Sequence, residues 1–209
     1  FTILVEEKRE NYRVLLNTLE ELGYGSRIKE TSNFGLLKAG DIATINGDYT
    51  HYIDQILRFT NQDYTWALYL LDPYGPKAIP LNIVSRVVSQ HRIDTIINLP
   101  YQDLHKKTGS AAKEEPTLSH IPHLEHYDSM YGEDTWRRIA EEYYSDRIDK
   151  ETMEKELVNL YQNVLMKRDT ELAIKRIPLK FPTKERTMYY LFLTTHDGTG
   201  ALVMNEILD

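Results

Sequence analysis

The sequence predicts an α/β fold in which a mostly parallel, doubly wound sheet ends in an antiparallel hairpin. Three observations support this prediction. Over residues 1–101, short apolar runs typical of buried strands alternate with apolar residues at helical spacing. Over residues 102–170, polar stretches and helical patterns interrupt the alternation. Over residues 171–209, two strand-like runs and one helical pattern complete the chain.

Residues 1–101 are expected to form the core of the domain. The predicted strands are 1–5, 42–45, 66–71 and 93–97, and the predicted helices are 11–22, 52–59 and 81–88. The run Trp66-Ala67-Leu68-Tyr69-Leu70-Leu71 is unbroken and apolar, which is typical of a strand buried on both faces of a parallel sheet. Helices between successive strands imply parallel pairing.

Residues 102–170 are expected to form a helical insertion outside the central sheet. Helical patterns lie at 135–144 and 150–166, after a polar stretch at 106–116. Residues 171–209 then supply strands at 174–181 and 188–194, joined by a turn at 182–184, and a last helix. We expect this hairpin to complete the sheet.

Composition excludes several classes of protein. The 209 residues contain no cysteine, so a disulfide framework, a thiolate zinc site and a cysteine nucleophile are excluded within them. No apolar window is long enough for a membrane span and no signal peptide opens the chain, which favours a cytoplasmic protein. The net charge of −7 opposes general binding to a phosphate backbone, although a local basic patch could still bind nucleic acid.

The residues that follow the predicted strands are the first candidates for a functional site. Ligands of open α/β sheets bind beyond the carboxyl ends of the strands, and here four strands are followed by polar residues: Glu6, Asp48, Asp72 and Asn98. An acidic residue in the position of Glu6 can accept hydrogen bonds from both ribose hydroxyls of an adenosine-containing cofactor. Two alternatives remain: Glu7 is the ligand, or Glu6 caps the following helix.

The tripeptide Asn46-Gly47-Asp48 is a second candidate for cofactor binding. It could place the Asp48 carboxylate near an adenine amino group, but the same residues are also a common turn signal.

The segment Asp72-Pro73-Tyr74-Gly75 is the most informative motif. A carboxylate, a rigid carbonyl and an aromatic face presented together suit a planar amine substrate, whereas the alternative is an ordinary β-turn. One strand later, Asn98, Pro100 and Tyr101 could border the same substrate pocket, or form a simple turn.

Three histidines, His120, His123 and His126, recur at every third residue. Pro122 prevents a helix there, and no carboxylate completes a familiar zinc spacing. We therefore expect a surface loop and no metal site.

The order of these motifs resembles the three-Cys-motif partner protein family. The resemblance rests on Val5-Glu6, Asn46-Gly47-Asp48, Leu70-Leu71-Asp72-Pro73-Tyr74-Gly75, Ile96-Ile97-Asn98-Leu99-Pro100, the segment from Tyr189 to His196, and Met204-Asn205. It spans nearly the whole chain.

The resemblance implies a Rossmann-like class I methyltransferase fold, S-adenosylmethionine as cofactor and a partner protein with three cysteines. It also implies an upstream first strand and a glycine-rich loop, and because the sequence opens within an apolar run we expect both to be missing from this chain. The motif at Asp72 is similar to the Asp-Pro-Pro-Tyr signature of methyltransferases acting on adenine amino groups, but Tyr74 stands third and Gly75 fourth.

Three functions are compatible with these features. The leading hypothesis is methyl transfer to an amino group, plausibly on a nucleobase, with Asp72, Pro73 and Tyr74 as catalytic residues. Glu6, Gly47, Asp48 and Asp72 would bind the cofactor, while Tyr74, Gly75, Asn98, Pro100 and Tyr101 would contact the substrate. The alternatives are a catalytically silent Rossmann-like scaffold for a partner protein and a domain that binds an adenosine-containing ligand for regulation.

Overall fold

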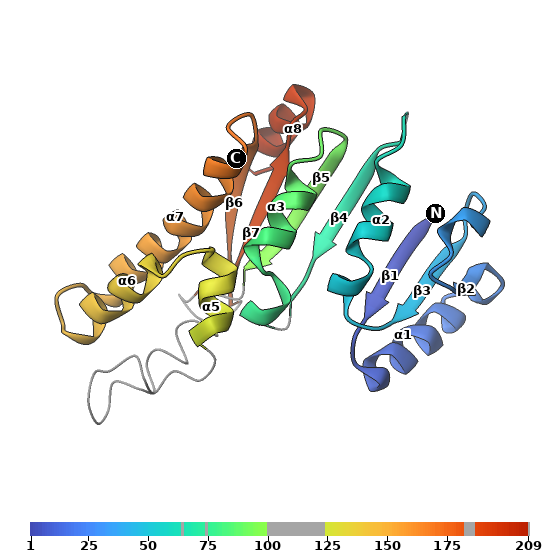
Figure 1. The fold of residues 1–209 in the computed structure, drawn as a ribbon, viewed down its shortest axis with the longest axis horizontal. Coiled ribbons are helices and arrows are strands. Elements are labelled where there is room, and N and C mark those ends of the chain that lie inside the picture. The colour runs from blue at the N-terminus through green and yellow to red at the C-terminus, as the bar shows by residue number, and fades with distance from the viewer. Residues whose placement is uncertain (64, 74, 100–123, 182–186, 209) are drawn as a thin grey trace. The chain divides into compact units, whose positions relative to one another are not determined.

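The computed structural model describes residues 1–63, 65–73, 75–99, 124–181 and 187–208. The chain divides into two compact units, Phe1–Thr65 and Trp66–Asp209, and each contains a sheet of its own (Figure 1). The prediction of one continuous sheet is therefore wrong for the described residues, whereas the α/β class and the parallel pairing are confirmed.

The first unit is a parallel three-strand sheet in the order β1-β3-β2. Its elements are β1 (Thr2–Glu6), α1 (Arg9–Glu21), η1 (Gly25–Arg27), β2 (Ile28–Glu30), η2 (Phe34–Leu36), β3 (Ile42–Asn46), η3 (Tyr49–His51) and α2 (Ile53–Thr60). The central strand β3 is buried from Ile42 to Ile45, and it is paired with β1 on one edge and with β2 on the other.

One buried side chain, Tyr12, links the helix α1 to the sheet. Its hydroxyl lies 3.0 Å from Glu30 Oε2 and 3.0 Å from Thr44 Oγ1. Because an ionised carboxylate only accepts, Tyr12 donates to Glu30 and receives the proton of the Thr44 hydroxyl. These bonds connect α1 with both β2 and β3.

The second unit is a mixed four-strand sheet in the order β4-β5-β7-β6. Its elements are β4 (Ala67–Leu71), η4 (Pro76–Ala78), α3 (Leu81–Val88), β5 (Ile93–Leu99), α5 (Leu124–Tyr131), α6 (Thr135–Tyr144), α7 (Lys150–Arg168), β6 (Ala173–Lys180), β7 (Thr187–Thr195) and α8 (Gly198–Leu208). Strands β4 and β5 are parallel, whereas β7 runs antiparallel to both β5 and β6. The predicted terminal hairpin is thus confirmed.

The core of the second unit lies between one face of this sheet and the helices that cover it. Along β5 every second residue from Ile93 to Leu99 is buried. Phe192 of β7 pairs with Ile97 and meets Tyr161 of α7 edge to face, with ring centroids 5.2 Å apart. Part of the predicted insertion, α7, therefore packs directly on the sheet, and α5 and α6 precede it as helices.

The prediction that residues 66–71 are buried on both faces is wrong. β4 is an edge strand, and Leu68 and Leu70 are 67% and 65% exposed, while Leu71 on the other face is 9% exposed. An unbroken apolar run does not by itself show which of its two faces is covered.

No helix in the described part of the chain is both long enough and apolar enough to cross a bilayer.

A stability prediction follows from Gly132, which has φ of +69° directly after α5. A Cβ there would lie 2.3 Å from Cδ2 of Leu81, a buried residue of α3. We expect Gly132→Ala to lower the free energy of unfolding by about 1–3 kcal/mol, because it adds both a steric clash and an unfavourable φ.

The measurement is chemical denaturation, and the matched control is Gly198→Ala. A Cβ at Gly198, the first residue of α8, meets nothing within 4 Å, so the control should change stability by no more than about 0.5 kcal/mol. Equal effects of the two substitutions would contradict the proposed clash.

Candidate functional site

Glu6 ends β1, as the sequence predicts, but its carboxylate already has a local role. Its Oε1 accepts a hydrogen bond of 2.8 Å from the backbone N–H of Lys8, the residue that precedes α1. The side-chain amide of Asn11 adds a longer contact of 3.4 Å to the same oxygen. Glu6 therefore caps the start of α1, which is the alternative that the sequence left open. No described residue donates to its second oxygen, Oε2.

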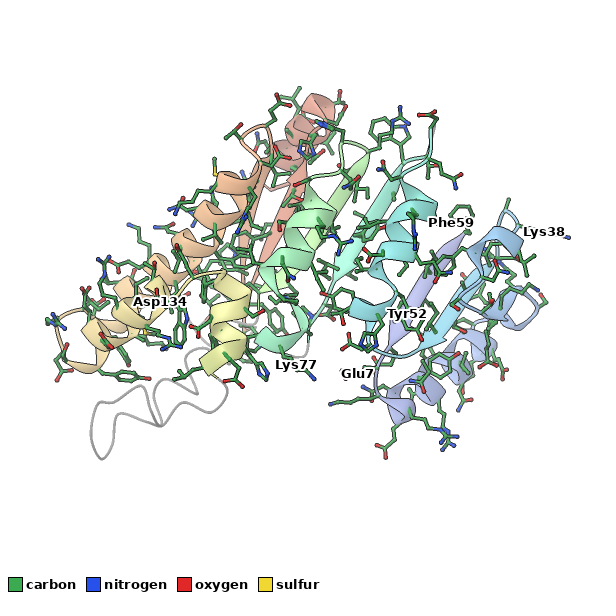
Figure 2. The ribbon with its side chains drawn as sticks, viewed as in Figure 1. Glu7, Lys38, Tyr52, Phe59, Lys77 and Asp134 are labelled. Atoms are coloured by element: carbon green, nitrogen blue, oxygen red, sulfur yellow. The ribbon has the colours of Figure 1, made fainter. Side chains whose placement is uncertain are left out.

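Asn46 and Gly47 hold the backbone where β1 ends. The Asn46 side-chain amide donates to the carbonyl oxygen of Glu6 at 2.8 Å, and the Gly47 N–H donates to the same oxygen at 3.0 Å. A Cβ at position 47 would lie 2.8 Å from the ring of Tyr52. Tyr52 and Glu7 are seen at this end of the first unit (Figure 2). A side chain at position 47 would thus clash with Tyr52, which explains a glycine there without any ligand.

Asp48 follows β3 and caps the short helix η3. Its Oδ1 accepts from the backbone N–H of Thr50 at 2.9 Å and from the Thr50 hydroxyl at 2.7 Å. Burial raises the pKa of the adjacent Tyr49 phenol, and the negative charge of Asp48 raises it further. Asp48 therefore also has a structural role, which agrees with the interpretation of this tripeptide as a turn.

Among the predicted site residues that the structure describes in the second unit, Asp72 and Asn98 are linked by a side-chain hydrogen bond. They follow Leu71 and Ile97, which are partners across the parallel strands β4 and β5. The Asn98 amide Nδ2 donates to Asp72 Oδ1 at 2.6 Å. Both residues thus lie at the carboxyl end of the sheet, toward which the arrowheads of β4 and β5 point (Figure 1), and Asp72 is exposed.

The remaining predicted residues divide into two groups. Pro73 and Gly75 are described, and a Cβ at Gly75 would meet no atom of the described residues within 4 Å. Tyr74, Pro100, Tyr101, His120 and His123 lie outside the described residues, and their proposed roles stay predictions.

Sequence reasoning did not find the pair formed by Tyr190 and Glu154. The Tyr190 hydroxyl donates to Glu154 Oε1 of α7 at 2.7 Å, and Tyr190 pairs with Leu99 at the carboxyl end of β5. Burial and the Glu154 carboxylate raise the pKa of Tyr190 to about 12. The phenol therefore stays protonated and serves as a donor. The sequence marks this position only by a tyrosine near the start of the second strand of the predicted hairpin.

A second cluster missed by sequence reasoning joins Asp169, His196 and His91 at the opposite end of the sheet. His196 Nε2 lies 2.9 Å from Asp169 Oδ2, and the rings of His196 and His91 are 4.7 Å apart. Because a carboxylate only accepts, Nε2 carries the proton. The His196 side chain is 4% exposed and that of Asp169 is 17% exposed, so this hydrogen bond is part of the packed structure.

Metal ligation finds no support in the described part of the chain, where no group of three or more His, Asp and Glu side chains could hold a metal ion. His126, the described member of the predicted histidine loop, instead belongs to α5, and its Nε2 is 3.8 Å from a Glu125 oxygen. The expectation of a surface loop is therefore wrong for His126.

Comparisons with protein-family models, with curated proteins and with solved structures find no match to this chain.

The cluster at Asp169 predicts a dependence of stability on pH. Burial tends to raise the pKa of this carboxyl, but hydrogen bonds from His196 and the Glu171 N–H, with the charges of His196 and His91, lower it below its usual value. A carboxyl whose pKa is lower in the folded state stabilises above its unfolded pKa of about 3.9, and this stabilisation is lost as pH falls through the folded pKa.

We therefore expect Asp169→Asn to lower the free energy of unfolding by about 1–3 kcal/mol at neutral pH and progressively less as the pH falls below about 4. Denaturant titrations at pH 7, 5 and 3 measure this difference. A destabilisation of equal size at all three pH values would contradict the assigned ionic role.

Proposed function

We propose that this protein is a methyltransferase that uses S-adenosylmethionine to methylate an amino group. The observation that carries the proposal is the contact between exposed Asp72 and Asn98 at the carboxyl ends of adjacent parallel strands. Ligands of open α/β sheets bind beyond this carboxyl end of the strands. The terminal antiparallel hairpin agrees with the fold implied by resemblance to the three-Cys-motif partner protein family.

The proposed chemistry follows from what a conjugated amine requires. Such an amine is a poor nucleophile because its lone pair is delocalised into the ring. Acceptors on its hydrogens favour the pyramidal form, and the Asp72 carboxylate and the Pro73 carbonyl would supply two of them. Tyr74 would stack on the ring, and Gly75 would leave room for the substrate.

Bound S-adenosylmethionine would supply an electrophilic methyl group for the attacking amine, and the electron pair of the methyl–sulfur bond would stay on the sulfur. The proton released from the nitrogen would pass to Asp72 or to water. Acceptor bonds to an amine strengthen as positive charge develops on the nitrogen, so Asp72 would stabilise the transition state more than the bound substrate.

The residues proposed for the cofactor fit it in part. The Oε2 atom of Glu6 remains an acceptor for ribose hydroxyls while Oε1 caps α1. The Asp48 carboxylate is engaged by Thr50 through Oδ1, and these hydrogen bonds would compete with an adenine amino group. Gly47 contributes backbone near both residues.

A second function is favoured by a specific observation, the structural roles of Glu6 and Asp48. If both carboxylates serve only as caps, the chain is a catalytically silent Rossmann-like scaffold for a partner that bears three cysteines. Binding of an adenosine-containing ligand for regulation is a further alternative. Cofactor binding separates the scaffold from the methyltransferase.

The first test is calorimetric titration of the full-length protein with S-adenosylmethionine. We expect Glu6→Ala to weaken binding by about 1.5–3 kcal/mol, the range for hydrogen bonds to a charged acceptor. Glu7→Ala tests the neighbouring carboxylate, and Glu10→Ala in the first turn of α1 is the control for loss of charge. Unchanged affinity in Glu6→Ala with a loss in Glu7→Ala would transfer the role to Glu7, and no binding by the wild type would favour the scaffold.

The second test is single-turnover methyl transfer by the full-length protein and its partner to amine-bearing nucleosides and single-stranded oligonucleotides. We expect Asp72→Asn to lower turnover by about 10²-fold with little change in cofactor affinity. Tyr74→Ala should chiefly weaken acceptor binding, by about 1–3 kcal/mol. Wild-type rates in Asp72→Asn would exclude the catalytic role, and loss of folding in that variant would favour a structural turn.

A further inference from the structure

The amide of Asn98 is held in one orientation by Asp72. Nδ2 lies 2.6 Å from Asp72 Oδ1, and an ionised carboxylate has no proton to donate. A flipped amide would place two acceptors face to face, so the amide nitrogen must point to the carboxylate. One of the two Nδ2 hydrogens is thereby committed to Asp72.

The other end of the Asn98 side chain is turned into the protein. Its Oδ1 atom is buried and accepts no hydrogen bond from the described residues. The oxygen of this amide is therefore covered, and one of the two hydrogens on its nitrogen is used by Asp72. The buried oxygen does not suit the direct substrate contact that the sequence predicted for Asn98, and the bond to Asp72 gives its nitrogen a different role.

The Asp72 carboxylate, by contrast, is held at one oxygen only. Asp72 is exposed, and no described residue donates to its Oδ2. An exposed aspartate alone samples several side-chain rotamers. A hydrogen bond from Asn98, in the strand paired with β4, restricts that rotation and leaves Oδ2 as the acceptor.

We propose that Asn98 is a positioning residue that orients the Asp72 carboxylate, so that Asp72 Oδ2 accepts a hydrogen from the substrate amine. This inference rests on the proposed methyl transfer and changes the role of Asn98 within it. Asn98 acts through Asp72 and does not touch the substrate. Its loss should therefore slow the reaction more than it weakens substrate binding.

The contact itself can be tested without any activity. In the full-length protein labelled with ¹⁵N-asparagine, one side-chain amide proton of Asn98 should resonate downfield of those of exposed Asn163, and Asp72→Ala should abolish this shift. The matched control is Asn46, whose amide donates to the backbone carbonyl of Glu6 and should not respond to Asp72→Ala. An unchanged Asn98 resonance in that variant would overturn the proposal.

The role in catalysis is tested by a double-mutant cycle. Asn98→Ala should lower kcat about tenfold and change KM for the acceptor less than about twofold, whereas in an Asp72→Asn background it should have no further effect. Asn163→Ala, on the exposed surface of α7, is the matched control and should leave both constants unchanged. Far-ultraviolet circular dichroism establishes that each variant is folded.

The outcomes distinguish this inference from the proposed function. An increase in KM with unchanged kcat in Asn98→Ala, or additive losses in the cycle, would return Asn98 to direct substrate binding and overturn the positioning role. If Asn98→Ala does not fold, the resonance experiment in Asp72→Ala still decides whether the two side chains are coupled. Absence of methyl transfer in the wild type, with the coupling intact, would overturn the proposed function and the positioning role with it.

Discussion

The parallel register of β4 and β5 is the constraint on which the candidate site depends. Leu71 pairs with Ile97, so the next residues, Asp72 just after β4 and Asn98 near the end of β5, lie at the same level. Parallel pairing requires a crossover, and α3 supplies it between the two strands. Had the strands been antiparallel, the carboxyl end of β5, with Asn98, would lie at the other end of the sheet, and the hydrogen bond between these side chains could not form.

The sequence predicted the elements with strong periodicity and missed those set by tertiary contacts. The helices α3 and α6 have the predicted bounds because buried apolar residues recur in them at helical spacing. The strand β2 was missed because Ile28-Lys29-Glu30 is short and mostly polar, and its pairing with β3 is what makes it a strand. The division into two sheets was missed for the same reason, since strand neighbours are not encoded in local periodicity.

The candidate site was predictable in position but not in its hydrogen bonds. The rule that ligands bind beyond the carboxyl ends of strands selected Asp72 and Asn98, and the structure places them in contact. It also selected Glu6 and Asp48, whose carboxylates cap α1 and η3. An acidic residue between the end of a strand and the start of a helix can either bind a ligand or cap the helix, and the sequence alone does not distinguish these roles.

The hydrogen bonds of three aspartates in the second unit have different effects on stability because these aspartates differ in solvent exposure. Asp128 accepts from the Trp136 indole and from Arg137, which links α5 to α6, and Asp169 is held by a nearly buried histidine. Burial tends to raise the pKa of both acids, yet their hydrogen bonds lower it, so these contacts stabilise the folded state. Asp72 is exposed, and water competes for its oxygens, so its bond to Asn98 adds little stability. What that bond does change is the direction in which the carboxylate points, which matters only if something binds there.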